Sequence, residues 1–348
     1  MVQDDTWFES NDGTKLYMRR WLPGPSSTAG EPVLASGPWS ASEPWPASQP
    51  WSASRPLAVV HIVHGMAEYA GRYRRLAEKL CGAGIEVWAA DQRGHGKTAD
   101  LSVNSPEKGG LLGHCADKDA FARVTADIAA INDEIRKTHP DIPLFLLGHS
   151  WGSFIVQNYI EGGNGCTEAI DGCILSGTRG PDSLKIKVGE MIIALLAVNR
   201  RRSGSPLARA IADGPYNRPF RPNRTSFDWI SRDEAEVDAY VNDPLNGNLC
   251  SLGFYRDLTK GPSQIHQNKA MARIRRALPI YIFCGSADPV GDMGASPTAL
   301  VNIYRSLGIK DLEFVLYPGA RHETLNETNR EEVMTNLLSW IHRHIGAV

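Results

Sequence analysis

Apolar runs rich in β-branched residues alternate with amphipathic stretches from Leu57 to the end of the chain. Six such runs occur in order: "LAVVHIVHG", "IEVWAAD", "PLFLLGH", "IDGCILSGT", "LPIYIFCG" and "LEFVLYPG". The stretches between them carry apolar residues at helical spacing, as in "DKDAFARVTADIAAINDEIRKTHP". Continuous apolar strands separated by helices are typical of a parallel sheet covered on both faces. The alternation therefore predicts an α/β fold with a mostly parallel central sheet and helices on both of its faces.

Two further strands are expected before Leu57. The segments "TWFES" and "KLYMRRWL" flank "NDG", a pattern typical of a β-hairpin with an Asp-Gly turn. Residues 24–56 then contain a six-residue unit that occurs three times, beginning at Pro38, Pro44 and Pro50. Its Trp, Pro, Ser and Ala content favours an extended surface excursion between strands. The alternative is that its tryptophans contact a lipid surface or a partner.

The stretch 180–277 interrupts the alternation and is too long for a simple connection between two strands. We expect it to be an inserted cap, or lid, over the carboxyl edge of the sheet, so that the core consists of residues 1–179 and 278–348. Ser231 and Glu234 have the spacing of a capping box, which predicts a helix start.

One segment of this insertion, "MIIALLAV", is apolar around its whole helical circumference. We therefore expect it to be covered on most sides. Three interpretations remain open: a lid helix that lines an acyl tunnel, ordinary packing against the sheet, or a face that rests on lipid with the help of Arg200, Arg201 and Arg202.

The segment "LFLLGHSWGSFIVQNYI" places Ser150 between two glycines at the end of an apolar run. A serine there could simply cap the following helix, but that interpretation does not explain why both flanking positions are small. A G-x-S-x-G sequence between a strand and a helix is typical of a sharp turn that exposes a nucleophilic serine. We therefore expect Ser150 to be a nucleophile.

A serine hydroxyl needs a base to become reactive, and the base needs an acid to orient it. His322 in "LYPGARHET" follows the last predicted strand and is the expected base. His342 and His344 lie within the closing helix and are expected at the surface. Asp288 in "IFCGSADPVGD" is the expected acid; Asp292 is its rival but lies farther from the strand.

Two backbone N–H groups are expected to stabilise the negative charge that develops on the substrate oxygen. One is that of Trp151, directly after Ser150, and the other is that of Met66 in "HIVHGMAEYAGRY". Other polar residues near the predicted strand ends are expected to be structural and to bond to nearby backbone: His64, Asp91, His95 and His149.

The composition excludes some functions and favours others. The chain has 37 Lys and Arg against 39 Asp and Glu, a net charge of −2, which gives no electrostatic case for a nucleic-acid partner. Its N-terminus lacks the apolar core of a secretory signal, and its longest apolar run, 188–198, is too short to cross a bilayer. Its six cysteines form no CxxC pair and no metal-ligand cluster. We expect a cytoplasmic protein with no metal or organic cofactor.

Five motifs, in order, resemble those of α/β-hydrolases similar to monoacylglycerol lipases and bacterial lysophospholipase-like esterases: "HGMAEYAGRY", "DQRGHG", "GHSWGS", "GSADPVG" and "YPGARHE". The resemblance extends from about Leu57 to the C-terminus and implies an α/β-hydrolase fold with a cap. It also implies a catalytic triad and oxyanion donors at the positions already singled out: Ser150, Asp288, His322, Met66 and Trp151.

Two features depart from the pattern of this family. Trp151 stands where typical relatives have Met, so an indole beside the nucleophile could narrow the acyl pocket. The Trp-Pro excursion is not a feature of the family, and the resemblance implies nothing about it.

The resemblance implies hydrolysis of an apolar acyl ester, such as a monoacylglycerol, a lysophospholipid or a short- or medium-chain ester, through an acyl-enzyme on Ser150. The expected partner is this small molecule, with weak membrane-surface contact through the cap. The alternatives are other acyl chemistry on the same triad (a peptidase, a thioesterase or an acyltransferase) and a ligand-binding relative that has lost turnover. A dehalogenase would need a carboxylate where Ser150 stands.

Overall fold

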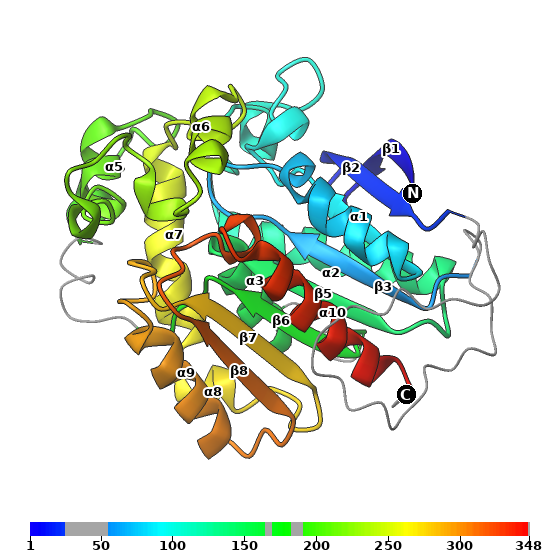
Figure 1. Ribbon diagram of the computed structural model, residues 1–348. Coiled ribbons are helices and arrows are strands. Elements are labelled where there is room, and N and C mark those ends of the chain that lie inside the picture. The colour runs from blue at the N-terminus through cyan, green and yellow to red at the C-terminus, as the bar shows by residue number, and fades with distance from the viewer. Residues whose placement is uncertain (25–54, 164–168, 182–190, 347–348) are drawn as a thin grey trace.

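The computed structural model describes residues 1–24, 55–163, 169–181 and 191–346 (Figure 1). The Trp-Pro excursion, apart from its ends, lies outside the described residues, as does the start of the apolar run at 188.

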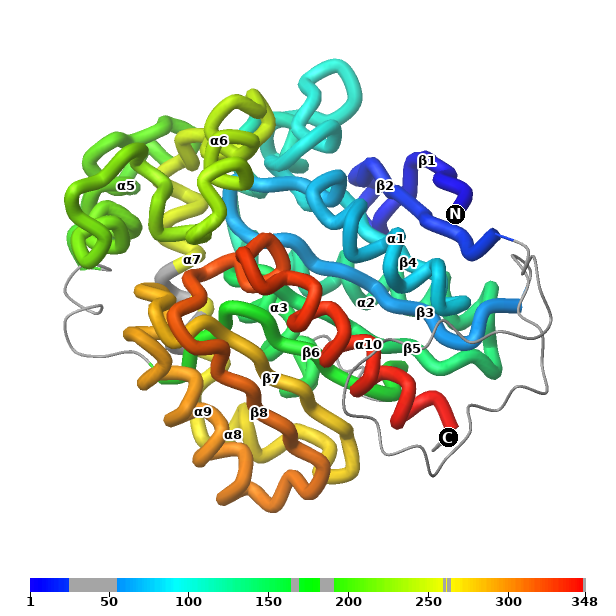
Figure 2. Tube along the Cα trace, viewed as in Figure 1, coloured from blue at the N-terminus to red at the C-terminus, as the bar shows by residue number. Residues whose placement is uncertain are grey.

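In the described residues the chain forms an eight-stranded sheet in the order β1-β2-β4-β3-β5-β6-β7-β8. The pairs β1–β2 and β2–β4 are antiparallel, and all other neighbours are parallel. The β1–β2 hairpin and β8 lie at opposite edges of the sheet (Figure 2). The strands are β1 (Val2–Glu9), β2 (Lys15–Leu22), β3 (Ala58–Val63), β4 (Ile85–Ala90), β5 (Leu144–His149), β6 (Gly172–Ser176), β7 (Ile280–Gly285) and β8 (Leu312–Tyr317). The predicted fold class and every predicted strand are confirmed.

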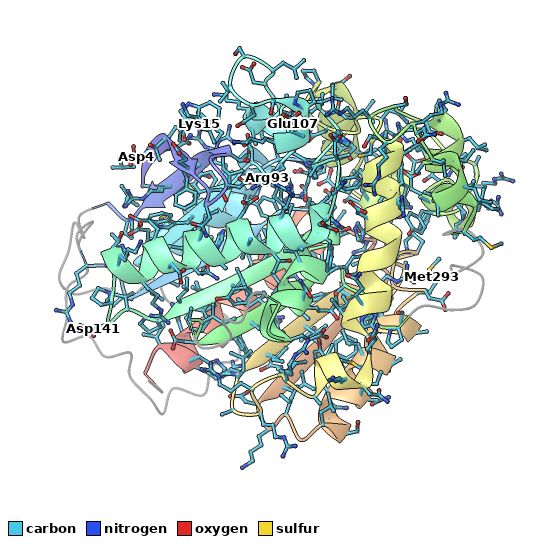
Figure 3. All side chains as sticks on the ribbon, turned by 180° about the vertical axis from the view of Figure 1, so that it is seen from behind. Asp4, Lys15, Arg93, Glu107, Asp141 and Met293 are labelled. Carbon is cyan, nitrogen blue, oxygen red and sulfur yellow. The ribbon has the colours of Figure 1, made fainter. Side chains whose placement is uncertain are left out.

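Helices cover both faces of the sheet, because the central strands bury all their residues and send alternate side chains to opposite sides. In β5, Leu146 belongs to a cluster with α2 (Ala120–Thr138), α3 (Trp151–Ile160) and α9 (Ala295–Ser306). Its neighbours Phe145 and Leu147 belong to a second cluster with α1 (Arg74–Gly82) and α10 (Arg330–Ile345). Figure 1 shows α1 and α10 in front of the sheet, and Figure 3 shows α2 on the opposite face.

A buried arginine fixes the N-terminal hairpin to this core. The Arg93 guanidinium donates to Asp127 of α2 at 2.6 Å and to Asp12, in the turn of the hairpin, at 2.9 Å. The side chains of Arg93 (labelled in Figure 3) and Asp127 are 2% and 3% exposed, so this pair is shielded from water, whereas Asp12 reaches Arg93 from the surface with 33% of its side chain exposed.

The register of the parallel strands places their carboxyl ends at one edge. Val63 pairs with Gly148, His149 pairs with Ser176, and Gly285 pairs with Tyr317. The loops that carry the predicted site residues therefore leave the sheet side by side.

The inserted segment (residues 180–277) contains α5 (Pro206–Ala212), α6 (Glu234–Asn242), α7 (Leu252–Ile265) and α8 (Asn268–Met271). Figure 1 shows α5 and α6 beyond the carboxyl edge of the sheet. By contrast, α7 packs against α2 and α3 of the core (Figure 3).

Two predictions about this segment were wrong in detail. Helix α6 begins at Glu234 with Asp233, not Ser231, as its N-cap, and the Asp233 carboxylate accepts from the Ala235 N–H at 3.1 Å. The Ser231 hydroxyl accepts instead from the Asp233 N–H, two residues further along. Aspartate caps a helix as well as serine does, and Asp233 stands directly before the helix.

The apolar helix of the segment, described over residues 191–196, is covered on one side only. Ile193 and Ala197 are buried, whereas Met191 is 62% and Leu195 69% exposed. A sequence that is apolar on every side cannot indicate which side is covered. No helix in the described ranges is long and apolar enough to cross a membrane.

Candidate active site

The backbone at Ser150 explains the two glycines around it. Ser150 has φ 53° and ψ −122°, an unusual conformation for a residue with a side chain. A Cβ at Gly148 would lie 2.6 Å from the Gly152 carbonyl oxygen, and a Cβ at Gly152 would overlap the Val63 carbonyl oxygen of β3. Both positions are glycine because the strand, the turn and the helix approach each other too closely for a side chain.

The turn holds Ser150 at the carboxyl edge of the sheet. Its N–H donates to the Ser176 carbonyl oxygen at 2.9 Å, and its carbonyl oxygen accepts from the Ser153 N–H at 2.9 Å. The next residue, Trp151, opens α3, so its N–H lies at a helix N-terminus, where no intrahelical acceptor exists. The close approach of Gly152 to β3 brings this N–H toward the loop that carries Met66.

Asp288 and His322 meet across the ends of β7 and β8. The His322 Nδ1 and the Asp288 carboxylate lie 2.9 Å apart, with side chains 4% and 0% exposed. Burial alone would lower the pKa of His322, but the Asp288 carboxylate more than offsets it, so the pKa is raised above its usual value. The rival Asp292 is exposed and does not share this contact.

One glycine lies beside the predicted nucleophile and another beside the predicted base, and both glycines lie against the ring of His149. A Cβ at Gly65 would be 3.1 Å from the Ser150 Cβ, and a Cβ at Gly177 would be 3.1 Å from the His322 Cε1. In the part of the chain that the structure describes, His322 hydrogen-bonds Asp288, and no hydrogen bond joins it to the Ser150 hydroxyl. Such contacts are often long in free enzymes and tighten when substrate binds.

Known proteins resemble this chain in sequence and in fold. The family model Hydrolase_4, described as "Serine aminopeptidase, S33", matches residues 54–329. A monoacylglycerol lipase of Mycolicibacterium smegmatis is 31% identical over 82% of this chain and 89% of its own length. A monoglyceride lipase of Mus musculus is 30% identical over 83% of this chain and 84% of its own. A thermostable carboxyl esterase from Bacillus coagulans, solved in complex with glycerol, has a TM-score of 0.79 and 25% identity, with 99% of each chain covered.

The chain belongs to the Hydrolase_4 family of α/β-hydrolases. It is a serine hydrolase of the carboxylesterase and lipase class, as the resemblance in the sequence implied.

Four other polar residues near the strand ends of this hydrolase were predicted to bond to nearby backbone, and three of them do. The His64 ring accepts from the Gln92 N–H at 2.9 Å, Asp91 accepts from the Ala70 and Lys97 N–H groups, and the His95 Nδ1 contacts the Arg93 carbonyl oxygen at 2.9 Å. His149 differs, because its Nδ1 lies 3.2 Å from the Ser176 hydroxyl rather than from backbone. Burial lowers the pKa of His149 to about 4, so its ring is neutral at pH 7.

The expectation that both histidines of the closing helix lie at the surface was wrong. His344 is buried, because its ring packs on Trp340 at 4.2 Å and bonds Asp311 at 2.9 Å. His342 is partly buried, and burial lowers its pKa to about 4. Neither ring therefore lies at the surface, and the His344 ring contributes to the packing of α10.

Trp151 is enclosed beside Ser150 and only 3% exposed. Its ring lies 4.9 Å from that of Phe254 of α7 and stacks on His95 at 5.9 Å. Trp229 of the inserted segment lies 5.1 Å from the His322 ring. Aromatic side chains of the inserted segment thus lie against both the residue after the predicted nucleophile and the predicted base.

Sequence reasoning missed three charged residues beside this site: Glu68, Arg72 and Glu323. Arg72 bonds both carboxylates within 2.8 Å. The signal present in the sequence was the i,i+4 spacing of Glu68 and Arg72 together with an acidic residue next to His322. Among the described residues, no three His, Cys, Asp or Glu side chains are grouped as a metal ion would require.

Proposed function

We propose that this hydrolase cleaves monoacylglycerols or related apolar acyl esters through Ser150, His322 and Asp288. The observation that carries the proposal is the buried Asp288–His322 contact at the sheet edge where the strained Ser150 turn emerges. The identity to monoacylglycerol lipases over most of the chain supports the substrate class.

In the proposed reaction, His322 removes the Ser150 proton as the oxygen attacks the ester carbonyl carbon. The Met66 and Trp151 N–H groups stabilise the oxyanion. The C–O bond to the alcohol then breaks, and His322 gives its proton to the leaving alcohol. Water, deprotonated by His322, attacks the acyl-enzyme and releases the fatty acid and Ser150. Asp288 keeps the imidazole oriented and stabilises its charged form.

The inserted segment is proposed to act as a lid that covers the acyl chain. Its support is the pair of contacts from Phe254 to Trp151 and from Trp229 to His322. Met191, Ile192 and Leu195, exposed on one side of its apolar helix, are proposed to rest on the lipid that contains the substrate.

Two aspartates provide a matched test of the proposed triad. Asp288→Asn should lower kcat about 10⁴-fold, because the imidazole loses its orienting carboxylate, while Asp292→Asn should leave it unchanged. Turnover of p-nitrophenyl esters and monooleoylglycerol measures both. Ser150→Ala should abolish turnover and labelling by a fluorophosphonate probe. Turnover that survives in Ser150→Ala, or a label mapped by mass spectrometry to another residue, would contradict the assignment.

A series of ester chain lengths tests the proposed narrowing by Trp151. Because the indole fills space beside Ser150, Trp151→Met should raise kcat/KM for long acyl chains about tenfold relative to short ones. An unchanged chain-length profile would show that the indole does not line the acyl pocket.

A peptidase is the second candidate, because the matching family model carries the description of a serine aminopeptidase. Aminoacyl p-nitroanilides provide the direct comparison. Cleavage of these amides with a higher kcat/KM than that of the esters would favour the peptidase.

A further inference from the structure

Arg72 lies at the centre of a buried cluster of charges beside the proposed catalytic residues. Its Nη1 donates to Glu68 at 2.8 Å and to Glu323 at 2.7 Å, and its Nη2 donates to the second Glu323 oxygen at 2.7 Å. The side chains of Arg72, Glu68 and Glu323 are 10%, 4% and 7% exposed. Bidentate pairing of this kind fixes the geometry of both partners.

Each carboxylate of the cluster is attached to a different loop of the site. Glu68 accepts from the Gly65 N–H at 2.5 Å, directly before Met66, and from the Tyr73 hydroxyl at 2.9 Å. Glu323 follows His322 in the chain, and its N–H donates to the Ile230 carbonyl oxygen at 2.7 Å. Arg72 therefore connects the oxyanion loop (residues 65–68) to the base loop (residues 318–324).

The inserted segment is connected to the same point. The Arg72 guanidinium lies 4.8 Å from the centre of the Tyr240 ring of α6. The Tyr240 hydroxyl donates to the Ala67 carbonyl oxygen at 3.0 Å, and the Gly247 N–H donates to the same oxygen at 2.8 Å. Two side chains thus fix the oxyanion loop: Glu68 accepts from its Gly65 N–H, and Tyr240 of the inserted segment donates to its Ala67 carbonyl oxygen.

The positive charge of Arg72 compensates the two carboxylates that it binds. Burial alone would lower the pKa of Arg72, but the Glu323 and Glu68 carboxylates raise it well above its usual value, so it stays charged. Without this cation, two buried carboxylates would face His322 in addition to Asp288. The neutral His149 ring, 4.9 Å from that of His322, adds no compensating charge.

We propose that Arg72 is a positioning residue that holds the oxyanion donors and the His322 imidazole at the right distance and orientation to each other for acyl transfer. It touches neither substrate nor Ser150; it acts through Glu68 on the oxyanion loop and through Glu323 on the base loop. The proposal rests on the proposed function of Ser150, His322 and Asp288.

Arg72→Lys and Glu323→Gln separate geometry from charge. Lysine keeps the positive charge but cannot pair with both carboxylates, so kcat for p-nitrophenyl butyrate should fall about 10- to 100-fold with KM within about twofold. The acid limb of kcat/KM, which reports the pKa of the free base, should stay in place. Glu323→Gln removes a carboxylate that raises the pKa of His322, so its acid limb should move to lower pH.

Arg74→Lys is the matched control and should behave as wild type, because Arg74, two residues further along at the start of α1, has a side chain that is 65% exposed and pairs with the exposed Glu78. A wild-type kcat in Arg72→Lys, or an acid limb in Glu323→Gln that stays in place, overturns the proposal. If thermal unfolding shows that Arg72→Lys does not fold, kcat of Glu323→Gln decides, because an amide cannot accept both Arg72 hydrogen bonds: a wild-type kcat overturns the proposal. Fluorophosphonate labelling of Ser150 in the wild-type protein is measured first: its failure counts against the proposed function, not against the role of Arg72.

Discussion

The sheet core and the inserted segment are stabilised in different ways. Strands β3, β4, β5 and β7 bury every residue, and their helices close two large apolar clusters. In the inserted segment, α7 and several neighbouring residues join the first of these clusters, and a separate cluster of four buried residues lies around Trp229 and Tyr240. Ion pairs at its rim attach it to the core, as between Arg232 and Glu327 at 2.9 Å. The core strands therefore position the predicted catalytic residues, while the part of the inserted segment around Trp229 and Tyr240 is held by a small apolar cluster and by ion pairs.

The largest difference in stability between the two regions is expected when one glycine in each is replaced by alanine. A Cβ at Gly152 in the core would meet carbonyl oxygens of β3, which cannot move, whereas a Cβ at Gly204 in the inserted segment would meet the flexible end of Leu249 at 3.0 Å. Gly152→Ala should lower the free energy of unfolding by about 3 kcal/mol or more, and Gly204→Ala by less than about 1 kcal/mol. Urea unfolding midpoints measure the stability of both variants. An equal loss of stability in the two would show that the core and the inserted segment tolerate a new side chain equally well.

A smaller effect is expected at the junction of the two regions. Glu327 is completely buried and accepts from the Arg232 N–H, the Arg232 Nε and the Arg321 N–H within 3.0 Å. Glu327→Gln should lower the free energy of unfolding by about 2 kcal/mol, because charge-assisted hydrogen bonds are lost. Hydrogen exchange should speed up in residues 228–242 and stay unchanged in β3 and β5.

Glu331→Gln is the control for this junction, since the Glu331 side chain is 71% exposed in its pair with Lys79. Its effect on unfolding should stay within about 0.5 kcal/mol. Exchange that accelerates equally in β3 and in residues 228–242 of Glu327→Gln would mean that the two regions unfold as one unit.

The smallest effect on stability is expected on the exposed side of the apolar helix. Leu195→Ser should change the free energy of unfolding by less than about 0.5 kcal/mol, because Leu195 is 69% exposed. Its affinity for phosphatidylcholine vesicles that contain monooleoylglycerol should fall about tenfold, as one apolar contact with lipid is lost. Ile193→Ala, on the covered side of the same helix, should instead cost about 2 kcal/mol or more of stability. Unchanged vesicle binding in Leu195→Ser would argue against lipid contact at this face.

The core was predictable from the sequence because fully buried parallel strands leave a continuous apolar signature, as in Leu144–His149. The same reasoning located Ser150, Asp288 and His322, since each directly follows or closely trails a strand that ends at one edge. The Asp288–His322 contact agrees with this placement.

Other features depend on distances along the chain that no local pattern reports. Arg72 and Glu323 are 251 residues apart, and only the assembled fold shows that they meet. The burial of His344 depends on Asp311, which is 33 residues away in sequence. The apolar helix has no polar residues on any side, so its sequence does not indicate that Ile193 is buried and Leu195 exposed.

The order of elements has a consequence for how this protein is made. Ser150 lies in the middle of the chain, but Asp288 and His322 follow the last two strands of the sheet. A growing polypeptide, or a fragment truncated before β8, can form the serine turn while it lacks its proposed proton acceptor. Ester cleavage through the proposed triad should therefore begin only after β8 and the loop that carries His322 have been made.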